Sequence, residues 1–151
     1  MRIIEHKIWM QEVPNEISLA ICVAGCTVGC KNCHWEELNK LEGRKMNMID
    51  YEYLLSMYKD LVSCVLFMGG DDDTNKEELI TFLELAKKYG YRTCLYSGRC
   101  GIIEEITEHL DYLKEGPWIE SLGGLDSPTT NQRFYRMPER EDLTHLFQKG
   151  E

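Results

Sequence analysis

The sequence predicts a single-domain α/β protein, built as a partial, open βα barrel around a mostly parallel sheet. Three observations support this fold class. Short apolar runs alternate with segments of helical periodicity. The connections between them are short and contain glycine, as is typical of βα units. A chain of 151 residues has room for about four to six such units, short of the roughly 250 residues of a closed eight-fold barrel.

Four apolar runs are expected to form the buried strands. They cover residues 17–23, 63–68 and 91–96, and a fourth run begins at Tyr112. The first run is rich in β-branched residues and lacks strict polar alternation, which favours a strand covered on both faces.

Helical spacing separates these runs. Asn47 or Asp50 is expected to cap a helix that continues to about Lys59. One side of this helix is expected to be apolar, formed by Ile49, Tyr53, Leu54 and Met57. A second helix, stopped by Gly90, has a stripe formed by Leu79, Phe82, Leu83 and Ala86. A third, short helix is marked by Ile102, Ile103, Ile106 and Leu110.

One domain is expected over residues 1–151, with a core at about 17–136 and a mostly charged, peripheral tail at 139–151. No repeat or low-complexity segment is visible. Residues 122–133 are polar and turn-rich and are expected to form either an ordered loop around the domain or a surface that faces a partner.

The composition narrows the classes of function. With 17 Lys and Arg against 26 Asp and Glu, the formal charge is −9, which argues against nonspecific nucleic-acid binding. The longest apolar run is too short to cross a bilayer, and the N-terminus lacks the features of a signal peptide. Seven cysteines without an export signal favour metal ligation or catalysis in the cytoplasm over disulfides.

A C-x-x-x-C-x-x-C motif follows the first expected strand and comprises Cys26, Cys30 and Cys33. Three thiolates can hold three irons of a [4Fe–4S] cluster and leave the fourth iron open, as a catalytic zinc keeps one open position. The alternative is a structural zinc site, in which Cys22 or His34 supplies a fourth ligand. Zinc ribbons usually bring a second ligand pair, and the chain has no second C-x-x-C.

The remaining cysteines are interpreted separately. Cys64 and Cys94 lie in apolar runs and are expected to be buried free thiols. Cys22 lies within the first strand and is expected mainly in the core, with a position near the site as the lesser alternative. Cys100 stands beside a turn and has no assigned role.

Two glycine-containing turns follow the next strands, Gly69-Gly70-Asp71 and Tyr96-Ser97-Gly98-Arg99. Ligands of parallel sheets collect at the carboxyl ends of strands, so these turns and the cysteine motif are expected to converge on one rim. Each is by default a tight turn, but glycine also lets a ligand approach the backbone. His34 and Trp35 can flank a cofactor, or they can be an exposed histidine beside a packed tryptophan. Arg133 can meet a carboxylate of the chain, a substrate or a partner.

Together these motifs resemble the radical S-adenosylmethionine superfamily, and within it the activating enzymes of anaerobic ribonucleotide reductase. The cysteine motif is similar to the superfamily signature, and Met68-Gly69-Gly70-Asp71 to its glycine-rich motif. Residues 127–133 are similar to an S/T-x-N-Q-R segment of these activases, and the resemblance covers about 17–136. The chain departs from the pattern at Asn32, often aromatic elsewhere, and at Val13-Pro14-Asn15-Glu16, commonly glycine-proline-glycine.

The resemblance implies a cluster held by Cys26, Cys30 and Cys33, with S-adenosylmethionine on the fourth iron. Catalysis would be carried by this cofactor and not by an acid–base side chain. The residues implied to border S-adenosylmethionine are Asn32, Cys33, His34, Gly69, Gly70, Asp71, Tyr96 and Ser97.

The implied partners are the glycyl-radical subunit of class III (anaerobic) ribonucleotide reductase and an electron donor such as flavodoxin or ferredoxin. No nucleic acid and no membrane is implied. Two alternatives remain open at this point. One is radical chemistry on another glycyl-radical enzyme or a small molecule, and the other is a non-catalytic zinc-binding interaction module.

Overall fold

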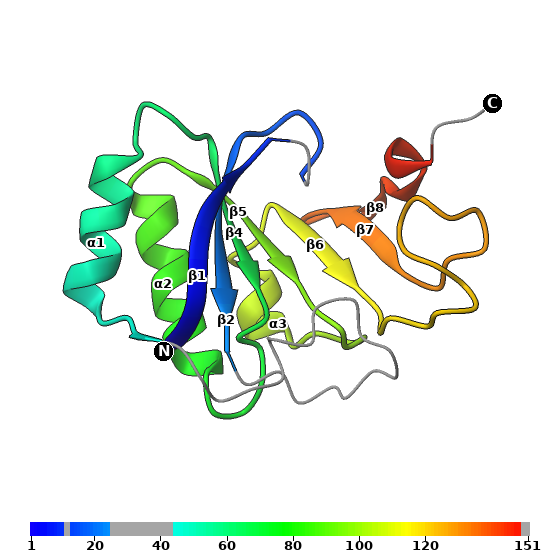
Figure 1. Ribbon diagram of the computed structural model, residues 1–151, viewed down its shortest axis with the longest axis horizontal. Helices are drawn as coiled ribbons and strands as arrows, with labels where there is room; N and C mark the ends of the chain where they lie inside the picture. The colour runs from blue at the N-terminus through cyan, green and yellow to red at the C-terminus, as the bar shows by residue number, and fades with distance from the viewer. Residues whose placement is uncertain (11–12, 25–43, 149–151) are drawn as a thin grey trace.

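A computed structural model describes residues 1–10, 13–24 and 44–148 (Figure 1). The described part contains one sheet in the order β3-β1-β2-β4-β5-β6-β7-β8. The strands are β1 (Arg2–Trp9), β2 (Ser18–Val23), β3 (Arg44–Lys45), β4 (Cys64–Met68), β5 (Arg92–Tyr96), β6 (Tyr112–Glu115), β7 (Arg133–Arg136) and β8 (Glu141–Asp142). The helices are α1 (Met48–Met57), α2 (Lys76–Lys88), α3 (Glu104–Thr107) and the 3-10 helix η2 (Thr144–Phe147).

The prediction of a partial βα barrel with a mostly parallel sheet is wrong. Within the described residues, β1 pairs antiparallel with β2 and β3, and β7 pairs antiparallel with β6 and β8. Only the β2-β4, β4-β5 and β5-β6 pairings are parallel. The fold is therefore a mixed sheet with three α-helices in the described chain, because antiparallel neighbours need no crossover helix between them.

The strands that the sequence did not predict lie toward the two margins of the sheet. β1 carries Glu5 and Lys7, and β7 is a four-residue strand with an arginine at each end. Marginal strands are exposed on at least one side and contain polar residues, so they lack the apolar runs that revealed the central strands. The sheet begins at Arg2, before the expected core.

The central elements agree with the sequence. β2, β4, β5 and β6 match the four expected apolar runs. The Asn47 side chain caps α1 by accepting a hydrogen bond from the Asp50 N–H at 2.9 Å. The expected stripe of α2 is buried throughout, whereas α3 has only four residues. None of the helices among the described residues combines the length and apolar character needed to cross a membrane.

The apolar side of α1 differs from the prediction. Its buried residues are Tyr51, Leu54 and Leu55, whereas Ile49 and Tyr53 are 80% and 66% exposed. Apolar residues occur all around this helix, so helical spacing alone does not identify the side that faces the core.

The sheet separates two apolar clusters. On the helical side, the rings of Tyr51 and Phe82 stack with centroids 4.2 Å apart, and the Tyr51 hydroxyl donates to the Phe82 carbonyl at 2.7 Å. On the other side, Phe134 of β7 packs edge-on against Phe147 of η2 and Tyr96 of β5. Leu143 and Phe147, in the tail that the sequence predicts to be peripheral, thus pack against this second cluster.

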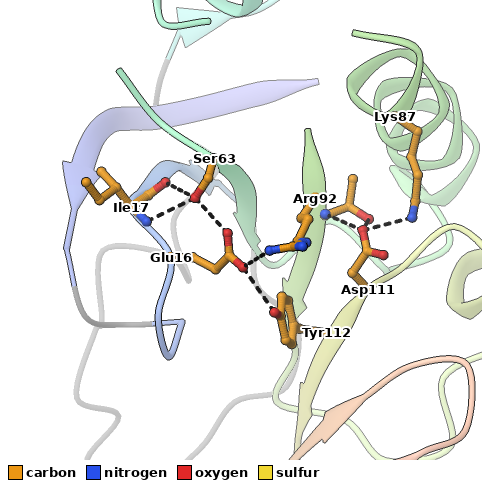
Figure 2. A network of polar contacts seen from close by, with 8 residues as sticks. Glu16, Ile17, Ser63, Lys87, Arg92, Asp111 and Tyr112 are labelled. Carbon is orange, nitrogen blue, oxygen red and sulfur yellow. Dashed lines mark hydrogen bonds and ion pairs between the residues drawn. The ribbon is translucent and has the colours of Figure 1, made fainter. Parts of the chain in front are cut away.

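A buried carboxylate joins the amino ends of the central strands (Figure 2). The Glu16 side chain is 2% exposed and lies 2.7 Å from the Arg92 guanidinium. It accepts hydrogen bonds from the Ser63 hydroxyl at 2.6 Å and the Tyr112 hydroxyl at 3.1 Å. Ser63 in turn accepts from the Ile17 N–H at 3.2 Å. One side chain thereby connects the starts of β2, β4, β5 and β6.

A second carboxylate extends this connection to α2. Asp111, just before β6, accepts hydrogen bonds from the Lys87 ammonium at 2.8 Å and the Thr93 N–H at 2.9 Å. Burial, followed by the charge of Glu16, raises the pKa of the Tyr112 hydroxyl to about 12, so Tyr112 remains a hydrogen-bond donor at neutral pH.

We expect Glu16→Ala to lower the free energy of unfolding by about 2–3 kcal/mol, because two hydroxyl donors lose their buried acceptor. Glu141→Ala is the matched control, since Glu141 pairs with Arg136 at the surface with a half-exposed side chain. We expect the control to change stability by less than about 0.5 kcal/mol. Urea denaturation followed by circular dichroism measures both, and equal midpoints would contradict a structural role for Glu16.

Candidate functional site

The carboxyl ends of the parallel strands form one rim. Cys22 of β2 is in register with Met68 of β4, Met68 with Tyr96 of β5, and Tyr96 with Lys114 of β6. The four strands therefore end in a single row (Figure 1). The chain leaves β2 toward the cysteine motif, β4 toward Gly69 and β5 toward Ser97 from this row.

Gly69 and Gly70 turn the chain sharply after β4. Their φ angles are +91° and +102°, a region that side chains other than glycine rarely adopt. The Gly69 N–H donates to the Tyr96 carbonyl at 3.0 Å, which holds the turn against the end of β5. A Cβ on Gly69 would lie 3.8 Å from the Val23 carbonyl oxygen. The turn thus lies beside the end of β2, and backbone conformation, not lack of space, requires glycine.

Asp71 joins the turn after β4 to the turn after β5. Its side chain is 4% exposed, and Oδ2 accepts from the Ser97 hydroxyl at 2.7 Å. The Arg99 guanidinium lies 3.6 Å from the same oxygen. The Ser97 hydroxyl also accepts from the Arg99 N–H at 3.0 Å. Asp71 and Ser97, both expected at the site, are therefore in direct contact, and Arg99 counterbalances the buried charge.

Tyr96 lies on the sheet face opposite the helices. It is 6% exposed and packs edge-on against Phe134, with ring centroids 6.2 Å apart. The Lys114 ammonium lies 4.9 Å from the Tyr96 ring centroid, a cation–π distance. The Ser97 N–H donates to the Lys114 carbonyl at 2.8 Å. Lys114 thus contacts two expected site residues, Tyr96 through its ammonium and Ser97 through its backbone carbonyl.

An ion pair of Glu115, at the carboxyl end of β6, was not predicted. Glu115 of β6 accepts from the Arg140 guanidinium at 2.8 Å and from the Gly101 N–H at 3.2 Å. Arg140 belongs to the turn between β7 and β8, 25 residues away along the chain. Because the pairing depends on the unpredicted strand β7, the sequence contained no local signal for it. Arg133 lies 3.9 Å from Asp142 with its side chain half-exposed.

The expected burial of three cysteines outside the motif is confirmed. Cys22, Cys64 and Cys94 are fully buried, whereas Cys100 is exposed. Burial raises the pKa of the Cys22 and Cys64 thiols to about 12, with smaller contributions from Glu5 and Glu16 respectively. Burial also raises the pKa of Cys94 well above its usual value.

The expected cluster ligands Cys26, Cys30 and Cys33 lie outside the described residues, as do Asn32, His34 and Trp35. Among residues 1–10, 13–24 and 44–148, no group of three or more His, Cys, Asp or Glu side chains could hold a metal ion. The described rim therefore contributes backbone groups, hydroxyls and an internally paired acid. Any metal chemistry of the proposed kind depends on the three motif thiols.

We expect iodoacetamide at pH 8 to alkylate Cys100 in the folded protein and to spare Cys22, Cys64 and Cys94. The buried thiols remain protonated at this pH, and the thiolate is the reactive species. Peptide mass spectrometry measures the labelling, with guanidinium-unfolded protein as the control in which all four react. Fast native labelling of Cys22 or Cys64 would contradict their assignment to the core.

The resemblance to the radical S-adenosylmethionine superfamily is based on the short sequence motifs alone. No known family matches the chain, and neither does any curated protein.

Proposed function

We propose that the protein is a radical S-adenosylmethionine activase that generates a glycyl radical on anaerobic ribonucleotide reductase. The observation that carries this proposal is the shared rim. β2, which the cysteine motif follows in the sequence, ends at the edge where Gly69, Gly70, Asp71 and Ser97 lie. Two motifs that are far apart in the sequence are thus attached to adjacent strand ends.

The donor chemistry of the motif fits an iron–sulfur cluster. Cys26, Cys30 and Cys33 would hold three irons, and three thiolates leave one coordination position open for a small molecule. When bound and reduced by an external donor such as flavodoxin or ferredoxin, the cluster would supply the electron that cleaves S-adenosylmethionine, and the resulting nucleoside radical would take a hydrogen atom from a reductase glycine.

The described residues would position the substrate. The turn after β4 consists of two glycines, of which Gly69 is half-buried and Gly70 is buried. Because Gly69 has no side chain, a polar group could approach its backbone closely. The Asp71–Ser97 hydrogen bond fixes this turn relative to the turn after β5. Asp71 acts in this proposal through Ser97 and Arg99, because its carboxylate already has these two partners.

Replacing Cys26, Cys30 or Cys33 with Ala should abolish cluster assembly and S-adenosylmethionine cleavage. Cys64→Ala and Cys94→Ala are matched controls that should keep the iron and cost about 1 kcal/mol of packing stability. Iron analysis of anoxically purified protein, expected at about four irons per chain, measures the first effect. Colourless protein with stoichiometric zinc would overturn the proposal in favour of a zinc-binding module.

The partner is tested with the wild-type protein. Anoxic incubation with a class III reductase, S-adenosylmethionine and a reductant should produce a glycyl-radical signal in electron paramagnetic resonance. If S-adenosylmethionine were cleaved without this signal, the result would indicate that the activase acts on another substrate.

Gly69→Ala should weaken S-adenosylmethionine binding by about five- to tenfold, because relief of the positive φ shifts the backbone that the ligand would approach. Gly90→Ala is a close control, with φ of +92° against +91° and no described atom within 4 Å of the added Cβ. Both changes should cost about 1–2 kcal/mol of stability, and the control should bind normally. S-adenosylmethionine binding is measured by equilibrium dialysis on iron-loaded protein. Equal binding by the two variants would show that the glycine pair forms a turn and does not contribute to ligand binding.

A further inference from the structure

The outer side of β1 is an open sheet edge in the described chain. β2 pairs with β1 from Ile3 to Trp9, whereas β3 covers its other side only at Arg2 and Ile3. Residues 4–8 therefore have no strand neighbour on the outer side among the described residues (Figure 1). An exposed edge of this kind is a template for pairing with another strand.

The backbone groups of His6 and Ile8 point to this open side. The Ile17 carbonyl, just before β2, accepts from the Cys64 N–H of β4, and backbone direction alternates along a strand. The backbone N–H and C=O groups of the even-numbered β2 residues therefore point toward β1. Glu5 forms a hydrogen-bonded pair with Cys22, and Lys7 forms one with Ala20. The intervening residues of β1 direct their N–H and C=O groups outward.

The sequence of this edge is complementary to itself. Glu5 and Lys7 flank His6 symmetrically, and their side chains lie on one face, 3.2 Å apart and about two-fifths exposed. If a second β1 pairs antiparallel about His6, Glu5 of each copy lies opposite Lys7 of the other. Directly opposed unlike charges stabilise a sheet, whereas parallel in-register pairing would oppose like charges.

An apolar groove adjoins the same edge. It has a volume of about 630 Å³, and its lining includes His6 of β1 and Ile49, Tyr53 and Met57 of α1. These three α1 side chains are 80%, 66% and 47% exposed. Two-fold pairing of β1 strands brings the helices on one sheet face toward their symmetry mates, so a second copy would cover this stripe. Contiguous exposed apolar surface is typical of interaction sites.

We propose that the β1 edge and the α1 groove form the two-fold interface of a homodimer, with a sheet continuous through two copies of the chain. The interface is isologous, because each copy supplies the same edge and the same groove. The proposal uses no residue of the cysteine motif and is independent of the proposed cofactor chemistry.

Charge exchange across the dyad tests the proposal. We expect wild-type protein to show a monomer–dimer equilibrium in sedimentation at protein concentrations of about 1–100 μM, the range typical of dimers of moderate affinity. Lys7→Glu and Glu5→Lys each place two like-charged pairs across the dyad, and each should raise the dissociation constant about tenfold at low salt. The double exchange Glu5→Lys/Lys7→Glu restores unlike pairs and should recover most of the affinity.

Tyr53→Glu tests the groove separately and should also weaken the dimer, because it buries a charge in an apolar contact. Glu139→Lys, an exposed charge in the turn between β7 and β8, is the control and should leave the dimer unchanged. Wild-type protein that stays monomeric throughout this range would overturn the proposal, as would a double exchange weaker than either single variant. Sedimentation needs no iron, so its outcome is separate from that of the cofactor experiments.

Discussion

The described fold depends on the buried carboxylate of Glu16. It lies at the amino ends of the three parallel pairings and binds partners before β4, at the start of β5 and at the start of β6. A buried charge is tolerated only when it is paired and hydrogen-bonded, and each partner of Glu16 comes from a different strand entry. The relative heights of the central strands are thereby fixed at one end of the sheet.

The same alignment is seen at the opposite end of the central strands. Because the central strands start in register, they also end in register, and the turns after β4 and β5 meet. The Asp71–Ser97 hydrogen bond holds these two turns together. Polar contacts at the amino ends thus serve stability, while the carboxyl ends present backbone and hydroxyl groups where parallel sheets bind ligands.

The sequence revealed the centre of the fold but not its margins. Apolar runs identified β2, β4, β5 and β6, and the spacing of Leu79, Phe82, Leu83 and Ala86 identified the buried side of α2. Charged strands such as β1 were missed, and with them the antiparallel pairings that make the sheet mixed. At the rim, Asp71 and Ser97 were predicted together, but the Glu115–Arg140 pair depends on a tertiary approach that no local pattern encodes. Glu16 stood out only as part of a departure from a family pattern.

The Glu16 contacts also constrain the order in which the central strands assemble during folding. Its partners Ser63, Arg92 and Tyr112 are 47, 76 and 96 residues away along the chain. Bringing such distant residues together costs chain entropy before the contacts contribute any favourable free energy. The carboxylate can acquire its full set of partners only once β6 has joined the sheet, so assembly of the central strands is completed, and not initiated, at this position.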